Sequence, residues 1–180
     1  MRVISGKARG IPLKTPEGML TRPTGDRVKE AMFSIIQFDI PGAAVLDLFG
    51  GTGQLGIEAL SRGAKSATFV DQNKNACSLI RENLKKTKLY DCGRVIQSDY
   101  QQYLRTCNEK YHIIFLDPPY AEVFLENSLK IITEIDILQS GGIIATEYPF
   151  GKVLPESLGA DFRSKQYKYG KTVLTIFRKD

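Results

Sequence analysis

An acidic residue, two prolines and a tyrosine follow a run of four apolar residues, in the order Ile113-Ile114-Phe115-Leu116-Asp117-Pro118-Pro119-Tyr120. The apolar run predicts a buried strand, which the prolines end. Asp117 brings a carboxylate that only accepts hydrogen bonds, and the prolines, which lack an N–H, add carbonyl acceptors without competing donors. Tyr120 adds a flat ring for stacking. We therefore predict that Asp117, Pro118, Pro119 and Tyr120 hold a planar group carrying an NH2. An ordinary turn is the alternative, because Asp and Pro are common there.

A glycine-rich loop, Asp47-Leu48-Phe49-Gly50-Gly51-Thr52-Gly53, joins an apolar strand to a predicted helix. Glycines allow a backbone to pass close to a ligand. Residues 51–56 also match the G-x-G-x-x-G pattern of dinucleotide-binding proteins, so a nicotinamide enzyme has to be considered. Asp47 argues against it, because a carboxylate there repels a diphosphate and attracts a cation. S-adenosylmethionine carries two such cations, a sulfonium and an ammonium. We expect this cofactor to contact Asp47, Phe49, Gly50, Gly51 and Gly53.

Two further acidic residues follow the next two predicted strands. Asp71, with Gln72 beside it, lies 18 residues after Gly53, where an acid that binds ribose hydroxyls is expected. Ser98 and Asp99 are candidates to accept the adenine amine. We count all four as cofactor-binding candidates, together with Asp117. Asp71 and Asp99 have an alternative role as caps of the helices that follow them.

Strands and helices alternate from residue 44 onward. Strands are predicted over 44–49, 66–70, 94–97, 113–116, 143–147, 162–169 and 172–178, and helices over 55–62, 74–87, 100–107 and 125–135. Repeated strand–helix units predict an α/β fold with a parallel sheet and helices on both faces. Ligands of such sheets bind at the carboxyl ends of the strands. Because Asp47, Asp71, Asp99, Asp117 and Glu147 all fall at such ends, we expect one shared site.

The first 24 residues are rich in basic residues and turn formers, which predicts a short hairpin or an extended arm. The next segment has one apolar stripe, Val28, Ala31, Met32, Ile35 and Ile36, so a helix is predicted there with Lys29 off the stripe. Basic residues of the arm and of this helix are candidates to hold the phosphates of a polyanion such as nucleic acid.

Composition limits the class of protein. The 180 residues are enough for one domain with a real core. The net charge of +5 is concentrated at the ends, with +4 in residues 1–30 and +5 in residues 162–180. A polyanion partner explains this distribution, although solvated basic termini are the alternative. Three cysteines without a CxxC pair favour reduced thiols in a cytoplasm and no metal framework. We find neither a signal peptide nor an apolar run of membrane-spanning length.

The quoted motifs resemble those of known families. Asp47-x-x-Gly50-Gly51-x-Gly53, with Asp71 and the Asp-Pro-Pro-Tyr segment, is similar to class I S-adenosylmethionine-dependent methyltransferases that act on exocyclic amines. Three more segments resemble the bacterial 16S ribosomal RNA guanine-N2 methyltransferases: Arg9-Gly10, Arg22-Pro23-Thr24-x-Asp26-Arg27-Val28-Lys29-Glu30-Ala31-Met32-Phe33 and Gly56-x-Glu58-Ala59-Leu60-Ser61-Arg62-Gly63-Ala64. The likeness runs from residue 2 to the carboxyl end. Gly51-Thr52 departs mildly from the family pattern, and the tail from residue 150 matches only in general character.

The resemblance implies a single Rossmann-like methyltransferase domain over residues 25–180, preceded by a basic arm over residues 1–24. It implies a mostly parallel seven-stranded sheet with an antiparallel carboxyl-terminal strand. The implied reaction is methyl transfer from S-adenosylmethionine to N2 of a guanine in 16S ribosomal RNA. The implied partner is ribosomal RNA, within the small subunit or an assembly intermediate, and the predicted RNA-binding residues are Arg2, Lys7, Arg9, Arg22, Thr24 and Arg27. The resemblance also implies a monomer that has no metal and no membrane contact.

Other classes share parts of this pattern. A methyltransferase acting on DNA adenine or another RNA has the same catalytic motif, but a DNA enzyme usually needs a target-recognition region. A protein-glutamine methyltransferase typically carries Asn in place of Asp117, and its substrate does not require a basic arm. A nicotinamide oxidoreductase and a non-catalytic RNA-binding module are the alternatives of a different class.

Overall fold

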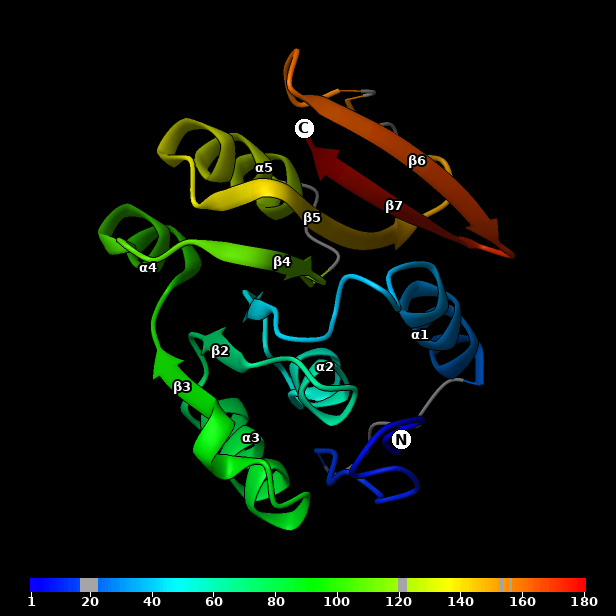
Figure 1. Cartoon of the computed structure of the whole chain (residues 1–180), viewed down its shortest axis with the longest axis vertical. Helices are drawn as coiled ribbons and strands as arrows, with labels where there is room; N and C mark the ends of the chain where they lie inside the picture. The colour runs from blue at the N-terminus through cyan, green and yellow to red at the C-terminus, as the bar shows by residue number, and fades with distance from the viewer. Residues whose placement is uncertain (17–22, 120–122, 153, 156) are drawn as a thin grey trace.

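The computed structural model describes residues 1–16, 23–119, 123–152, 154–155 and 157–180, and within them seven strands form one sheet (Figure 1). The strand order is β3-β2-β1-β4-β5-β7-β6. Strands β1 to β5 are parallel, and β7 lies antiparallel between β5 and β6. This arrangement confirms the predicted fold class. The strands are β1 (Ala44–Asp47), β2 (Ser66–Asp71), β3 (Gly93–Gln97), β4 (Tyr111–Leu116), β5 (Leu138–Pro149), β6 (Phe162–Tyr169) and β7 (Thr172–Lys179).

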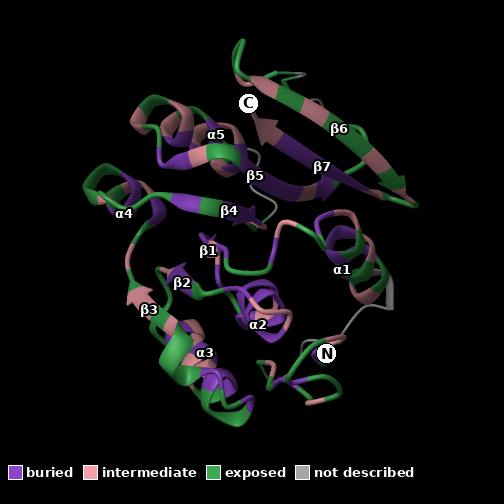
Figure 2. Cartoon of the chain, viewed as in Figure 1, coloured by how far each residue is buried: buried purple, intermediate pink, exposed green. Residues whose placement is uncertain are grey.

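Helices cover both faces of the sheet. Side chains along β4 alternate between the faces, so that Phe115 packs with Phe33 and Phe69 on one face while Leu116 packs with Leu104 and Leu129 on the other. In Figure 2 the strands in the middle of the molecule are mostly buried. The first face is covered by α1 (Pro23–Ile35), α2 (Gln54–Ser61) and α3 (Lys74–Lys86), and the second by α4 (Tyr100–Thr106) and α5 (Val123–Ile135). No helix in the described part of the chain is long and apolar enough to cross a membrane.

Two local predictions are corrected. Strand β5 starts at Leu138 rather than at residue 143, and it includes Gly141 and Gly142. Lys29 is buried, although the helical pattern placed it off the apolar stripe. Its Nζ donates a hydrogen bond to the carbonyl oxygen of Arg2 at 2.9 Å and lies 4.0 Å from the Glu58 carboxylate. A buried ammonium group is tolerated when it is paired in this way.

The amino-terminal segment packs against α2 and α3. One antiparallel bridge joins Arg2 to Pro12, and the core takes up Val3, Ala8 and Leu13. Buried Glu58 on α2 accepts hydrogen bonds from the backbone N–H groups of Ile4 (2.8 Å) and Ser5 (3.0 Å). On α3, the side chain of Asn83 exchanges hydrogen bonds with the backbone of Lys14. The segment is therefore held on the same face of the sheet as α2.

Candidate functional site

A cleft of about 830 Å³ lies at the carboxyl ends of β1 to β4. Its lining includes four predicted acids, Asp47, Asp71, Asp99 and Asp117. The parallel register explains how they meet, since Asp47 pairs with Phe115 of β4 and Asp71 with Gln97 of β3. The other predicted residues on the lining are Phe49, Gly50, Gly51, Gln72, Ser98 and Pro119.

Two predicted site residues, Gly53 and Pro118, do not line the cleft in this structure. Gly53 forms the amino-terminal cap of α2, with φ of 78°. A side chain at Gly53 would approach Ile57 and Ile80, so this glycine serves packing and backbone geometry. Pro118 is half-buried beside Asp117 but absent from the lining, and Tyr120 lies outside the described residues.

Backbone hydrogen bonds fix the shape of the glycine loop. The Gly50 N–H donates to the carbonyl oxygen of Val70 on the neighbouring strand, at 2.9 Å. The Asp71 carboxylate accepts hydrogen bonds from the N–H of Gly51 at 2.9 Å and of Asn73 at 2.8 Å. Asp71 therefore connects the loop to the end of β2 and does not cap α3, whose cap is Asn73.

Asp99 has the capping role that we left open for it. Its Oδ1 accepts hydrogen bonds from the backbone N–H groups of Gln101 at 2.9 Å and Gln102 at 3.2 Å, at the start of α4. Capping and ligand binding are compatible here, because the residue also lines the cleft. A carboxylate has acceptor sites on both oxygens.

Asp47 is almost completely buried, with 1% of its surface exposed. Loss of water raises its pKa to about 8, against the opposing effect of a hydrogen bond from the Gly56 N–H at 3.0 Å. The charges of Asp117 and Asp71 contribute to this raised pKa. A cation bound next to Asp47 would favour the ionised form and lower this pKa.

Asp117 and Glu147 form a second pair of interacting carboxyl groups. They follow Leu116 and Thr146, which pair in register on the parallel strands β4 and β5. Burial raises the pKa of Asp117 to about 6. Burial, and then the charge of Asp117, raise the pKa of Glu147 to about 8. The two acids therefore titrate as a pair, in which the charge of Asp117 opposes ionisation of Glu147.

Sequence analysis missed several residues of the site. Glu147 was expected at the strand ends that form the site but was given no role there. The rings of Tyr100 and Phe124 line the cleft and lie 5.5 Å apart, and Phe49 lies 5.3 Å from Tyr100. Tyr100 directly follows Asp99, which is a signal available in the sequence. Met1 also lines the cleft, and no local pattern predicts this long-range contact.

The described basic candidates lie on the surface. Arg2, Lys7, Arg9 and Arg27 are exposed, whereas Arg22 and the side chain of Thr24 are outside what the structure describes. The Lys7 N–H donates to the carbonyl oxygen of Ser61 at the carboxyl end of α2. The eight residues of α2 put this contact about 12 Å from the glycine loop.

Neither metal binding nor base catalysis by histidine finds support among the described residues. No group of three or more His, Cys, Asp or Glu side chains there is arranged to hold a metal ion. His112 accepts a hydrogen bond from the Ala44 N–H through Nδ1, at 3.2 Å. This contact connects β4 to β1.

Comparisons with known proteins agree with this geometry. The family model described as Conserved hypothetical protein 95 matches residues 1–178. YlbH of Bacillus subtilis (strain 168) is 40% identical over 99% of both chains. Ribosomal RNA small subunit methyltransferase D of Escherichia coli (strain K12) is 33% identical over 86% of this chain and 78% of the relative. The solved structure of Escherichia coli yhhF superposes with a TM-score of 0.90 at 28% identity, over 100% of this chain and 98% of the other. The chain therefore belongs to the Conserved hypothetical protein 95 family, which agrees with the resemblance of its motifs to ribosomal RNA methyltransferases.

Proposed function

We propose that this protein transfers a methyl group from S-adenosylmethionine to the exocyclic amine, N2, of a guanine in 16S ribosomal RNA. One observation carries the proposal: Asp47 and Asp117, on neighbouring strands, line the same cleft. The first acid suits a cationic cofactor, and the second suits an NH2 group. Relatives named ribosomal RNA small subunit methyltransferase D support the choice of RNA.

The cleft fits the cofactor in size and chemistry. Its volume of about 830 Å³ falls within the ordinary range for small-molecule sites. Asp47 would hold the cationic end, Asp71 and Gln72 the ribose, and Ser98 and Asp99 the adenine amine. When bound, S-adenosylmethionine supplies an electrophilic methyl group on a sulfonium. Phe49, Tyr100 and Phe124 provide an apolar wall that excludes water.

Asp117 and Pro118 have the central role in positioning the substrate. Their carboxylate and carbonyl oxygens would accept hydrogen bonds from the two N–H bonds of the guanine amine and favour a pyramidal nitrogen. Alignment of the two reactants can contribute about 7–11 kcal/mol to lowering the barrier. A strong general base is unnecessary, because the product nitrogen loses its extra proton readily.

The guanine has to leave its stack to reach Asp117. Stacking on Tyr120 would return about 1–3 kcal/mol of that cost. The exposed Arg2, Lys7, Arg9 and Arg27 would hold phosphates outside the cleft, together with Arg22 and Thr24. The enzyme would work in the cytoplasm, as a monomer that needs no metal. Its substrate would be the small subunit or an assembly intermediate, and residues 1–24 would form a basic arm.

The decisive experiment uses small ribosomal subunits from a strain that lacks the gene. Incubation with the protein and S-adenosylmethionine should place one new methyl group on a guanine N2, mapped by mass spectrometry of RNA digests. Calorimetry should show binding of S-adenosylmethionine and no binding of NAD. Methylation of protein or DNA instead of this RNA would refute the proposed substrate.

The arm has a test of its own. Arg9→Ala should weaken RNA binding more than it weakens binding of S-adenosylmethionine. Lys88→Ala, which removes an exposed positive charge after α3, is a control for net charge. Equal losses of RNA and cofactor binding by Arg9→Ala would indicate misfolding and remove the argument for an RNA contact.

A further inference from the structure

The cleft takes up one half of the active edge of the sheet. The strands that contribute to its lining are β1, β2 and β3, through residues at or just past their carboxyl ends, and β4, through Asp117 just past its end. A cofactor bound there covers that half. In the strand order, the ends of β5, β7 and β6 lie on the other side of Asp117. A target base can therefore reach Asp117 from the side of this second half.

The hairpin of β6 and β7 places its tip at this edge. Since β7 is antiparallel to β5, and β6 is antiparallel to β7, β6 runs in the same direction as β5. The end of β6 at Tyr169 and the turn at Gly170 therefore lie at the same edge as Asp117. Figure 1 shows β5, β7 and β6 as the outer strands of the sheet, beyond β4.

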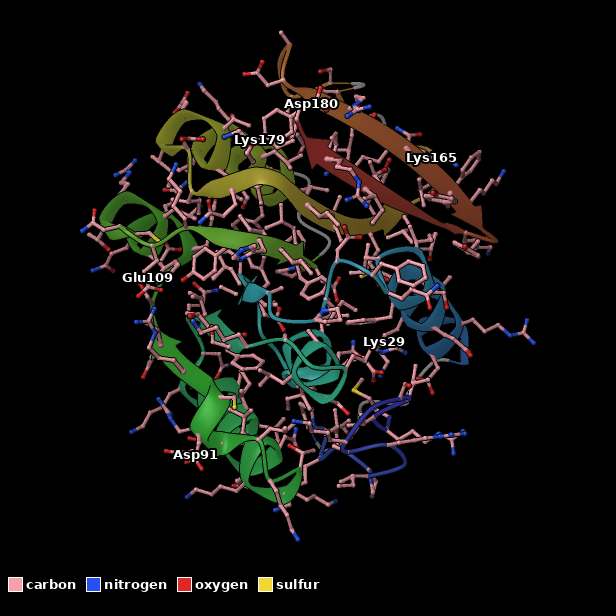
Figure 3. All side chains as sticks on the ribbon, in the orientation of Figure 1. Lys29, Asp91, Glu109, Lys165, Lys179 and Asp180 are labelled. Carbon is pink, nitrogen blue, oxygen red and sulfur yellow. The ribbon has the colours of Figure 1, made fainter. Side chains whose placement is uncertain are left out.

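The tip of the hairpin is basic. Residues 165–172 contain three lysines, Lys165, Lys168 and Lys171, all exposed, and no acidic residue. Figure 3 shows Lys165 on β6, at the outside of the molecule. Its Nζ lies 5.3 Å from the ring centroid of Tyr167. Lys165 pairs with Ile176 and Lys168 with Val173, which belong to the cores on opposite faces of the sheet. The two lysines therefore point to opposite faces, and Lys168 is the one nearer the turn.

Phe150 lies next to the hairpin tip and remains 60% exposed. Its backbone N–H donates to the carbonyl oxygen of Lys171 at 2.8 Å, which fixes the residue to the turn. The Nζ of Lys168 lies 3.5 Å from the Phe150 ring centroid. A large apolar ring held in solvent beside an ammonium group offers a stacking surface and a phosphate contact at one place.

The opposite end of the same hairpin differs in its charge pairing. There Arg163 pairs with Asp180, Lys179 with Asp136, and Arg178 with Asp39. Within the part of the chain that the structure describes, Lys165, Lys168 and Lys171 have no ion pair with an acidic side chain. The unneutralised positive charge is therefore at the end of the hairpin near Asp117, where an incoming polyanion would meet it.

We propose that Phe150, Lys168 and Lys171, the hairpin-tip surface, bind RNA next to the target nucleotide. An unpaired base stacks on Phe150 while the lysines contact the adjoining phosphates. The inference rests on the proposed function and adds a second RNA contact on the opposite side of Asp117 from the amino-terminal arm.

The test measures RNA binding without catalysis. A labelled RNA stem-loop with guanines in its loop is titrated by fluorescence anisotropy, with S-adenosylhomocysteine saturating, over a series of salt concentrations. The slope of log affinity against log salt is negative. In the Lys168→Gln/Lys171→Gln double variant it should become less steep, by about 0.7 for each lost contact to unpaired RNA. Phe150→Ala should weaken binding about tenfold, as for one lost stacked base.

The matched control is Lys65→Gln/Lys86→Gln. Both residues are exposed lysines at the amino edge of the sheet, before β2 and at the end of α3, so the charge change is the same. This control should bind RNA like the wild type. Unchanged cofactor affinity and melting temperature in every variant show that the fold is intact.

The outcomes separate this inference from the proposed function. If the hairpin-tip variants bind RNA as tightly as the control while the wild type methylates its RNA, the RNA-binding role of the hairpin-tip surface is refuted and the proposed function stands. If they bind RNA normally but fail to methylate assembled subunits, the surface contacts protein, and the RNA contact is refuted. If the wild type binds the stem-loop but methylates no ribosomal RNA, the proposed function fails while the hairpin-tip measurement remains decisive for RNA binding.

Discussion

Asp117 lies two residues beyond Phe115, the β4 residue that pairs in register with Asp47 of β1, and both carboxyl groups line one cleft. The two acids differ in burial, because Asp47 is enclosed by the glycine loop and α2 whereas Asp117 is partly exposed. Parallel pairing thus places an acid suited to a cation beside an acid suited to an amine. The predictions that follow test this arrangement and the contacts that support it.

Asp117→Ala should abolish methyl transfer while changing the affinity for S-adenosylmethionine by no more than a few-fold. The carboxylate is proposed to grip the amine, and the loss of such a charged contact typically costs at least about a hundredfold in rate. Single-turnover methylation and calorimetry measure the two effects. Asp91→Ala, at an exposed acid between α3 and β3, serves as a control. Full turnover by Asp117→Ala would exclude the amine-binding role.

Binding of S-adenosylmethionine should release a proton near neutral pH. Asp47 has its pKa raised to about 8 in the absence of ligand, and a bound cation favours its ionised form. Affinity should therefore rise as the pH increases toward about 8 and level off above it. Calorimetry in two buffers with different ionisation enthalpies counts the protons. Asp47→Asn should abolish this proton release, and an unchanged release in that variant would assign the proton to another group.

Glu147 should make the ligand-free protein less stable as the pH rises. Its pKa is raised from 4.5 to about 8 on folding, so the folded state binds more protons than the unfolded chain between these values. Stability therefore falls with rising pH in this window, by up to about 1.4 kcal/mol per pH unit. Urea unfolding of Glu147→Gln should show a flatter profile than the wild type, and Glu134→Gln, an exposed α5 residue, should not. Parallel profiles for all three proteins would contradict the burial of a protonated Glu147.

Glu58→Gln should destabilise the protein and loosen the amino-terminal segment. Glu58 accepts hydrogen bonds from Ile4 and Ser5 and pairs with Arg62 at 2.8 Å. A neutral side chain also removes the carboxylate that lies 4.0 Å from the buried Lys29 ammonium group. Breaking a buried pair typically costs about 3–5 kcal/mol. Urea unfolding gives the cost, and hydrogen exchange of residues 3–8 reports on docking.

Gly6→Ala provides a second route to the same effect on the segment. Gly6 has φ of +82°, and a Cβ there would lie 1.9 Å from the carbonyl oxygen of Ser61. The variant should raise hydrogen exchange in residues 3–8 while keeping Glu58 in place. Gly10→Ala is the matched control, since its φ is similar but no atom lies within 4 Å of the added Cβ. Slow exchange in both Gly6→Ala and Glu58→Gln would show that neither contact holds the segment.

The sequence by itself determined the order of elements and the strand-end location of the candidate acids. Apolar runs that end in Asp, Gly or Pro are local patterns, and parallel strands necessarily bring their carboxyl ends to one edge. For this reason Asp47, Asp71, Asp99 and Asp117 could be assigned to a shared site before any tertiary contact was known. The apolar stripe of α5, with Leu125, was readable in the same way.

Only the tertiary structure decided which of these residues interact and which basic groups remain unpaired. The burial of Lys29 against Glu58, the coupling of Glu147 to Asp117 and the location of Phe150 at the hairpin tip depend on strand order and on contacts between distant segments. Helical periodicity placed Lys29 at the surface because it contains no information about the amino-terminal segment that covers α1. Local pattern fixes which way a side chain points from its own element, whereas its solvation and its partners are set by the elements that pack against it.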